Sequence, residues 1–167
     1  LLDLIQQHGI KADQVAKLVV RVAHQGANTV NNRHMPDICM QHMCAVMLID
    51  GFVSFKSSHD EKRMKNRQVL DVRSRVELYG DDELTRAMPS RQGIVELTLT
   101  DGRALKLHVK AVRGTSDNPM SRQEVDAKSY DLLAPVLGKA RARKLCDAVW
   151  AIEKIADCKK LRPLLQA

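Results

Sequence analysis

Aromatic side chains are nearly absent from this sequence, in which Phe, Tyr and Trp together make up 3% of the residues. Proteins that bind single-stranded nucleic acid stack bases on aromatic rings, so this scarcity argues against such a protein despite a net charge of +7. The basic residues are spread along the chain, and small clusters at residues 62–67 and 139–144 are typical of solvated helix faces. We therefore expect no nucleic-acid partner and a core built from aliphatic side chains and methionine.

Long apolar runs, targeting signals and metal motifs are also missing. No apolar run approaches the roughly 20 residues that a membrane-spanning helix needs, and the N-terminus lacks the basic stretch and apolar run of a signal peptide. The four cysteines, Cys39, Cys44, Cys146 and Cys158, form no CxxC pair and lack the clustered partners of a metal site. We expect a cytoplasmic protein with buried free thiols, no bound metal and no membrane partner.

The length and composition suit one folded domain. A chain of 167 residues with 44% hydrophobic side chains is large and apolar enough to bury a core. It begins without methionine and inside a helical pattern that includes Leu1, Leu2, Leu4 and Ile5. We expect residues 1–167 to form a single α+β domain that is the C-terminal part of a longer protein.

Apolar periodicity and capping residues predict the helices. One helix is expected to end at Gly9, and an apolar helix capped by Asp37 is expected to end at Gly51. Helices are also predicted over residues 58–66, from about residue 67, from the Ser121–Glu124 capping box to Gly138, and over the final apolar stripe.

Alternating apolar residues predict strands at residues 15–23, 72–79, 93–100 and 103–112, while residues 26–34 are polar and turn-like. The resulting element order is α-β-α-α-β-β-β-α-α. This order favours an α+β fold with a mostly antiparallel four-stranded sheet packed with helices.

The last two predicted strands must share one apolar face, which constrains the turn between them. A two-residue loop would place Leu97 opposite Lys106, because side chains alternate along a strand. A three-residue loop over residues 100–102 instead pairs Leu97 with Leu105. We predict this loop, with Gly102 in the left-handed conformation.

Three segments follow one another in an order that resembles a known family. Residues 41–51 (QHMCAVMLIDG) read as a helix with a Leu-x-Asp-Gly type of end, and residues 95–102 (VELTLTDG) as one arm of a hairpin. Residues 113–121 (RGTSDNPMS) form a Gly-x-x-x-Asn-Pro-Met-Ser connection. Together they resemble the C-terminal domain of the MmgE/PrpD family, whose members include 2-methylcitrate dehydratase and cis-aconitate decarboxylase. Family members are more than twice this length, so the resemblance implies an upstream all-helical domain.

The resemblance implies a lyase or isomerase that acts on small polycarboxylates without a metal or an organic cofactor. Such reactions remove a proton beside a carboxylate, so they need a base and cations that hold the carboxylates. Most of these groups belong to the family's helical domain, so this chain is expected to form a lid or one wall of the cleft. The resemblance also implies that the full-length protein is a homodimer.

His42 is the candidate catalytic residue. In the decarboxylase branch of the family a tyrosine reaches the site from the same helix, and counting back from Gly51 places that position at His42. A histidine there departs from the family pattern, although it can act as an acid or base near neutral pH. Without the resemblance, the plainer interpretation is a hydrogen-bonded histidine at a helix packing surface.

Four further residues are candidates for substrate binding. Arg33 and His34 lie in the polar loop before the helix, where an arginine can hold a carboxylate with two hydrogen bonds. His59 opens the next helical segment, and Arg91 lies just before the third strand. All four are equally compatible with solvated surface residues, so a non-catalytic α+β binding or assembly module remains the alternative.

Overall fold

The computed structural model describes residues 1–166. Contacts divide the chain into two compact units, residues 1–112 and the residues from Arg113 onward, and each unit is described by itself. The elements of the first unit are α1 (Leu2–His8), β1 (Val15–Ala23), α2 (His24–Val30), α3 (Met40–Asp50), α4 (Phe55–Ser58), α5 (Arg67–Arg73), β2 (Val76–Asp81), α6 (Asp82–Arg86), β3 (Gly93–Leu99) and β4 (Ala104–Val109). Those of the second unit are α7 (Arg122–Leu137), α8 (Lys139–Trp150) and α9 (Arg162–Leu165). Short 3₁₀ helices lie at Ala12–Gln14, Pro36–Ile38, Glu61–Lys65, Ile152–Lys154 and Cys158–Leu161.

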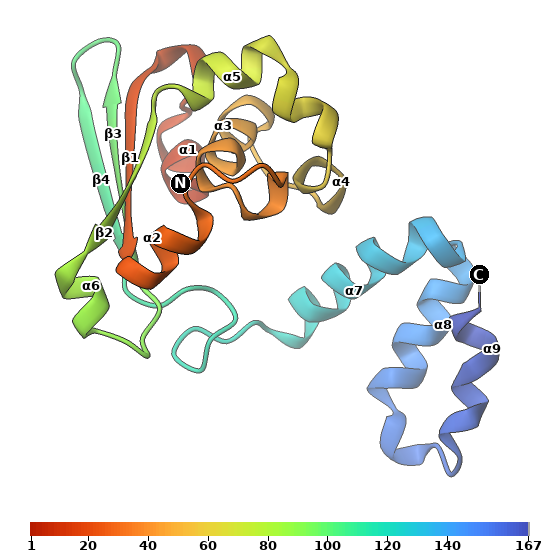
Figure 1. The fold of residues 1–167 in the computed structure, drawn as a ribbon. Helices are drawn as coiled ribbons and strands as arrows, with labels where there is room; N and C mark the ends of the chain where they lie inside the picture. The colour runs from red at the N-terminus through yellow and green to blue at the C-terminus, as the bar shows by residue number, and fades with distance from the viewer. Residues whose placement is uncertain (167) are drawn as a thin grey trace. The chain divides into compact units, whose positions relative to one another are not determined.

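The first unit is built on a four-stranded sheet with the strand order β2-β1-β3-β4 (Figure 1). β3 pairs with β1 and with β4 in antiparallel fashion, but β1 and β2 are parallel. The predicted α+β fold with a four-stranded sheet is confirmed. The prediction of a mostly antiparallel sheet is corrected to a mixed sheet with one parallel pair.

The parallel pair follows from the long helical connection between β1 and β2. Parallel neighbours need a crossover that returns the chain to the same end of the sheet, and the alternation of each strand carries no sign of it. The element order also differs from the predicted one, because α2, α6 and α9 are additional helices. α2 occupies a stretch that reads as turn-like because Asn28 and Thr29 are weak helix formers. Tertiary packing stabilises it: Ala27 is buried, and α2 contacts β2.

Several predicted boundaries are wrong, and others are confirmed. Residues 72–79 alternate as a strand would, but Val72 is buried on α5 and the strand begins only at Val76. α3 begins after Cys39, and Asp37 lies in the preceding 3₁₀ helix rather than at the N-cap. The helix expected over residues 58–66 is replaced by α4 and the 3₁₀ helix Glu61–Lys65. The predicted helix ends at Gly9 and Gly51 are confirmed, with left-handed φ values of 61° and 78°.

The hairpin between β3 and β4 has the predicted three-residue loop. Leu97 pairs with Leu105, and the Leu99 N–H donates to the Arg103 carbonyl at 2.8 Å, which leaves residues 100–102 as the loop. Gly102 has a φ of 87°, as predicted. A local rule, the parity of alternating side chains, was therefore sufficient to fix this register.

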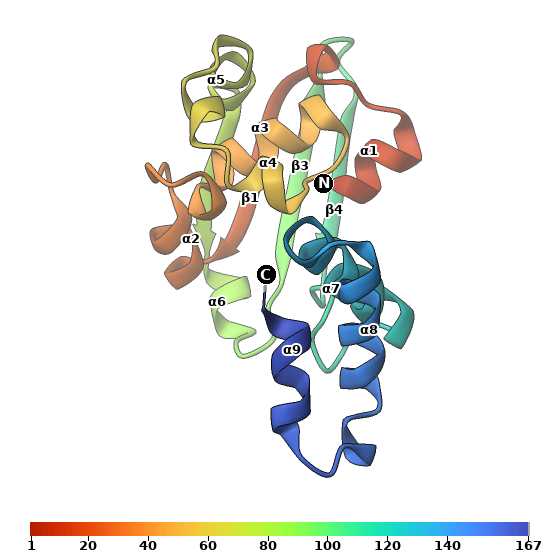
Figure 2. The same cartoon turned by 90° about the vertical axis from the view of Figure 1, so that its right-hand side faces the viewer.

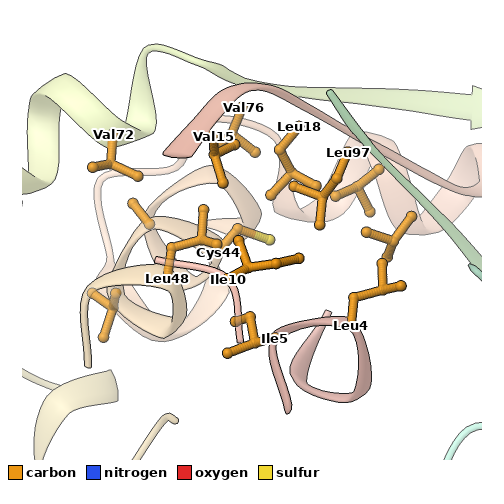
Figure 3. Packing of buried hydrophobic residues seen from close by; sticks show 14 of the residues in the cluster. Leu4, Ile5, Ile10, Val15, Leu18, Cys44, Leu48, Val72, Val76 and Leu97 are labelled. Carbon is orange, nitrogen blue, oxygen red and sulfur yellow. The ribbon is translucent and has the colours of Figure 1, made fainter. Parts of the chain in front are cut away.

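Helices cover one face of the sheet and form the core with it. Figure 2 shows α3 across the middle of this face, with α1 and α5 on either side. Leu18 of β1 and Leu97 of β3 are almost completely buried beneath these helices, and Figure 3 shows side chains from α1, α3 and the strands converging. Burial raises the pKa of the Cys44 thiol to about 12, which makes it an inert core group. The prediction of buried free thiols holds for three cysteines but is wrong for Cys158, which is exposed.

The opposite face of the sheet carries a ladder of ion pairs. Lys17 Nζ lies 2.9 Å from Glu77 Oε2. Glu96 is shared by Arg21, at 3.2 Å, and Lys106, at 2.8 Å. Exposed pairs of this kind contribute little to stability. The three cations of the ladder are paired with two carboxylates, so the ladder adds only one positive charge to the net charge.

In the second unit, one carboxylate joins α7 to α8. The predicted capping box is confirmed at the start of α7: the Glu124 N–H donates to Ser121 Oγ at 3.2 Å, and the Ser121 N–H donates to Glu124 Oε2 at 2.7 Å. One turn later Asp126 accepts hydrogen bonds from Arg143, at 2.7 and 2.6 Å, and from Trp150 Nε1, at 2.7 Å. These bonds lower the pKa of Asp126 to about 2.

We expect Asp126→Asn to lower the denaturant midpoint of the second unit clearly more than Asp147→Asn does. Asp126 holds Arg143 and Trp150 together, whereas Asp147 contacts only Arg143 Nε, at 2.9 Å, from an exposed position. The chain has one tryptophan, so the fluorescence of Trp150 reports the unfolding of this unit. Equal midpoints for the two variants would contradict the role given to Asp126.

Candidate functional site

His42 lies near the start of α3, a helix with buried side chains on nearly every side. The helix packs against α5 and against β2. The side chain of His42 is 0% exposed, and neither ring nitrogen has a hydrogen-bond partner among the described residues. Buried polar groups in folded proteins are nearly always hydrogen-bonded. These two nitrogens therefore distinguish His42 from an ordinary core residue.

The surroundings of His42 favour its neutral form. Burial lowers the pKa of His42 below its usual value of 6.5, and the positive charges of Arg73 and Arg63 lower it further. The negative charge of Asp60 acts in the opposite direction. A neutral imidazole can accept a proton, which is what a general base requires.

We expect the contribution of His42 to stability to fall in acid. The pKa of folded His42 lies below its unfolded value of 6.5. Below pH 6.5 the unfolded chain therefore takes up a proton at His42 more readily than the folded chain does. The stabilisation that is present above pH 6.5 is lost as the pH falls through the folded pKa. Urea unfolding from about pH 7.5 down to about pH 5 would test this. The free energy of unfolding of wild type should drop relative to that of a His42→Leu variant as the pH falls. A constant difference between the two proteins would contradict the expectation.

Gln41, the residue before His42, is also buried, but its side-chain oxygen and nitrogen both have hydrogen-bond partners. Its side chain is 2% exposed. Gln41 Oε1 accepts a hydrogen bond from the Asn32 N–H at 2.9 Å, and Gln41 Nε2 donates to Asn31 Oδ1 at 2.6 Å. Arg73 donates to Asn32 Oδ1 at 3.1 Å. This network, which sequence reasoning missed, holds the loop before α3 against the helix.

Arg33 and His34 continue that loop. The Arg33 guanidinium donates to the carbonyls of Thr29, at 2.7 Å, and Asn28, at 2.8 Å, and so caps the C-terminal end of α2. His34 is exposed. Nε and one Nη of Arg33 therefore bind the backbone of the first unit.

His59 lies at the end of α4 and is exposed. Its ring stacks on Phe55 with the ring centroids 4.1 Å apart, and its Nδ1 lies 2.8 Å from the Phe55 carbonyl oxygen. The next residue is Asp60, whose charge acts on His42. His59 therefore belongs to the segment that supplies part of the electrostatic environment of His42.

Arg91 lines a cleft of about 500 Å³ in the first unit. α2 and the end of β1 form one wall, and the loop that carries Met88, Arg91 and Gln92 forms the other. Met40, the first residue of α3, also lines this cleft. The Arg91 side chain has no hydrogen bond or ion pair within the part of the chain that the structure describes.

The five predicted site residues fall into two groups. Met40 lines the cleft of Arg91, whereas His42 follows two residues later, roughly 200° further around the helix. His42 and Arg91 therefore lie on different sides of α3. The loop that carries Arg33 and His34 is bonded through Asn32 to Arg73, whose charge acts on His42. His59 adjoins Asp60, whose charge also acts on His42.

A histidine–carboxylate pair that sequence reasoning missed lies where the parallel strands β1 and β2 end. His24 Nε2 is 2.8 Å from Asp82 Oδ1, and the His24 N–H donates to Thr85 Oγ1 at 3.0 Å. A Cβ atom at Gly80 would lie 2.1 Å from His24 Nδ1, so the glycine makes room for the ring. The only signal in the sequence is Gly80, because a glycine inside a strand indicates that another group approaches the backbone closely. The sequence does not show that this group is His24, which lies far away along the chain.

We expect the effect of Gly80→Ala on stability to change sign with the residue at position 24. In wild type the new methyl group displaces the His24 ring from Asp82, which should cost about 1 kcal/mol. In a His24→Ala background it should instead stabilise by about 0.5–1 kcal/mol, because alanine loses less conformational entropy than glycine. Urea unfolding of the four proteins completes a double-mutant cycle. Equal effects in both backgrounds would contradict the contact.

Residues 1–166 contain neither a candidate metal-binding cluster nor a candidate membrane-spanning helix. No group of three or more His, Cys, Asp or Glu side chains there could hold a metal ion. No helix in the same range is long and apolar enough to cross a membrane.

Comparison with known proteins identifies the family. A search of curated proteins finds no match, but the family described as the MmgE/PrpD C-terminal domain matches residues 1–153. The match includes α3 with His42, the β3–β4 hairpin, α7 and α8. It confirms the resemblance noted in the sequence and extends over nearly the whole chain. The chain therefore belongs to the MmgE/PrpD family.

Proposed function

We propose that this chain is the C-terminal domain of a PrpD-like dehydratase, or of a related cofactor-independent lyase or isomerase, that acts on small polycarboxylates. The observation that supports this most is His42 on α3 of an MmgE/PrpD domain, a buried histidine with a lowered pKa and two ring nitrogens that no described residue pairs with. In this proposal His42 accepts or returns the proton beside a carboxylate. An upstream helical domain supplies the rest of the cleft, and the full-length protein forms a homodimer.

The charges that act on His42 fit such a role. A proton taken up by His42 would create an imidazolium under the influence of two arginines, Arg63 and Arg73, which disfavour it. A substrate carboxylate nearby would offset these charges and so stabilise the protonated form. Uptake of the proton would then depend on bound substrate, and the proton would be returned readily as the reaction proceeds.

Substrate can reach His42 only if a covering segment moves. We place this cover in the loop before α3, which is bonded to Gln41 and, through Asn32, to Arg73, whose charge acts on His42. Arg33 and His34 lie on the same loop. Movement of the loop would expose His42 and bring the Arg33 guanidinium to a substrate carboxylate.

The direct test is an assay of the full-length protein against citrate-like and aconitate-like acids. Products identified by NMR would separate dehydration, decarboxylation and epimerisation. We expect turnover of at least one di- or tricarboxylate without an added metal or organic cofactor. A protein that binds none of these acids and turns over none of them would overturn the proposal.

The alternative is a non-catalytic α+β binding or assembly module. The observation in its favour is the complete burial of His42 in this structure. In that case His42 would be a core residue, and its replacement would leave every activity of the full-length protein unchanged.

A further inference from the structure

The cleft beside α2 combines a free cation with an apolar floor. Its volume of about 500 Å³ falls in the range of small-molecule sites. Apolar side chains from the end of β1, α2, the start of α3 and the loop after α6 line it: Val22, Ala23, Val30, Met40 and Met88. A ligand seated there would place an apolar body against the end of β1 and α2.

The polar groups gather on the loop side and along α2. Gln92 has its Oε1 2.8 Å from His108 Nε2, which fixes the amide. Thr29 donates its hydroxyl hydrogen to the Gln25 carbonyl at 2.8 Å. These groups are therefore partly committed to the protein, and a ligand would find few strong neutral partners among them.

Arg91 differs from the other arginines near α2. Arg33 is held by two carbonyls and Arg21 by Glu96, whereas the Arg91 side chain has no partner among residues 1–166. An exposed guanidinium at the edge of an apolar cleft suits an anion that is itself partly apolar. A planar carboxylate matches its two parallel N–H donors.

We propose that this cleft binds a short-chain monocarboxylate, with the carboxylate on Arg91 and the alkyl chain against Val22, Val30 and Met40. The charge of Arg91 selects an anion. The apolar floor favours an alkyl chain over a second or third carboxylate, because a buried carboxylate without a partner is costly. The inference stands apart from the role of His42, which lies on a different side of α3.

Gly26 offers a way to fill the cleft without touching Arg91. It lies on α2 and lines the cleft, and a Cβ atom there would make ordinary contact with Val22 Cγ2 at 3.6 Å. A leucine at this position would extend into the space beside Val22. Gly26→Ala is the matched control, because it should support the helix while leaving most of the cleft open.

The experiment is a titration of the full-length protein with hexanoate, hexanol and citrate, followed by calorimetry and by methyl NMR of Met40 and Met88. We expect saturable hexanoate binding that weakens about tenfold or more in Arg91→Gln, as for loss of a charge-assisted hydrogen bond. Binding should also be lost in Gly26→Leu and kept in Gly26→Ala. Hexanol should bind more weakly than hexanoate.

Three outcomes would overturn the proposal: no saturable binding of hexanoate, equal binding by Arg91→Gln, or tighter binding of citrate than of hexanoate at this cleft. Turnover of polycarboxylates, measured in Gly26→Leu and Gly26→Ala, separates this inference from the proposed activity. Loss of hexanoate binding in Gly26→Leu with unchanged turnover supports the cleft alone. Inactivity of wild type with intact hexanoate binding rejects only the proposed activity.

Discussion

Replacing His42 with leucine should stabilise the fold and abolish most of the activity. Leucine removes two buried nitrogens that have no partners among residues 1–166, and relieving such groups should raise the free energy of unfolding by about 1–3 kcal/mol. The same change removes the proposed acid–base group. Turnover of the full-length protein should therefore fall by about 10²-fold or more. Urea unfolding and steady-state turnover, measured on the same preparation, give both quantities.

The two readouts distinguish a functional histidine from a merely buried one. Met43→Leu is the matched control, because it is a volume-conserving change at the next residue of α3, which is only half-buried. It should change stability and turnover little. A His42→Leu protein that is less stable and fully active would show that His42 is a structural residue with partners that form in the intact protein.

Opposite signs for stability and activity are expected where a protein retains an unfavourable group for function. A buried polar group without a partner costs free energy, and the apolar surroundings on α3 would suit an aliphatic residue at position 42. The lowered pKa of His42 and the lack of partners for its nitrogens within the described part of the chain both follow from this one environment. The proposal is that substrate supplies the missing partner.

Local features were predictable from the sequence, and distant contacts were not. The hairpin register followed from alternation alone, and the ends of α1 and α3 followed from Gly9 and Gly51. The parallel β1–β2 pair depends on the crossover connection, and α2 depends on its packing against β2. Neither feature leaves a local pattern in the sequence from which it could be predicted.

The same distinction applies to the candidate site. Sequence reasoning placed His42 on the correct helix, but its burial depends on the packing of α3 against elements distant in the chain, α5 and β2. Arg33 was expected to be free for a carboxylate, yet its partners are backbone carbonyls at the end of α2. The Gly80–His24 contact joins residues far apart in the chain, so only the glycine hinted at it.

Gln41→Leu should have the opposite effect on stability to His42→Leu, although the two residues are neighbours on one helix and both are buried. The substitution leaves the Asn32 N–H and the Asn31 side chain without the partners they have at 2.9 and 2.6 Å. Loss of these bonds at a 2%-exposed position should lower the free energy of unfolding by about 2–3 kcal/mol. Urea unfolding of the two single variants measures the contrast.

The Gln41 variant also tests the loop as the cover of His42. With its hydrogen bonds to α3 removed, the loop should exchange its amide hydrogens faster at residues 31–35, while the amides of β1 and β3 keep their protection. Met43→Leu is the control, because it changes volume little at a half-buried position of the same helix and leaves the hydrogen bonds of Gln41 in place. If Gln41→Leu leaves loop exchange unchanged, Gln41 does not hold the loop against α3.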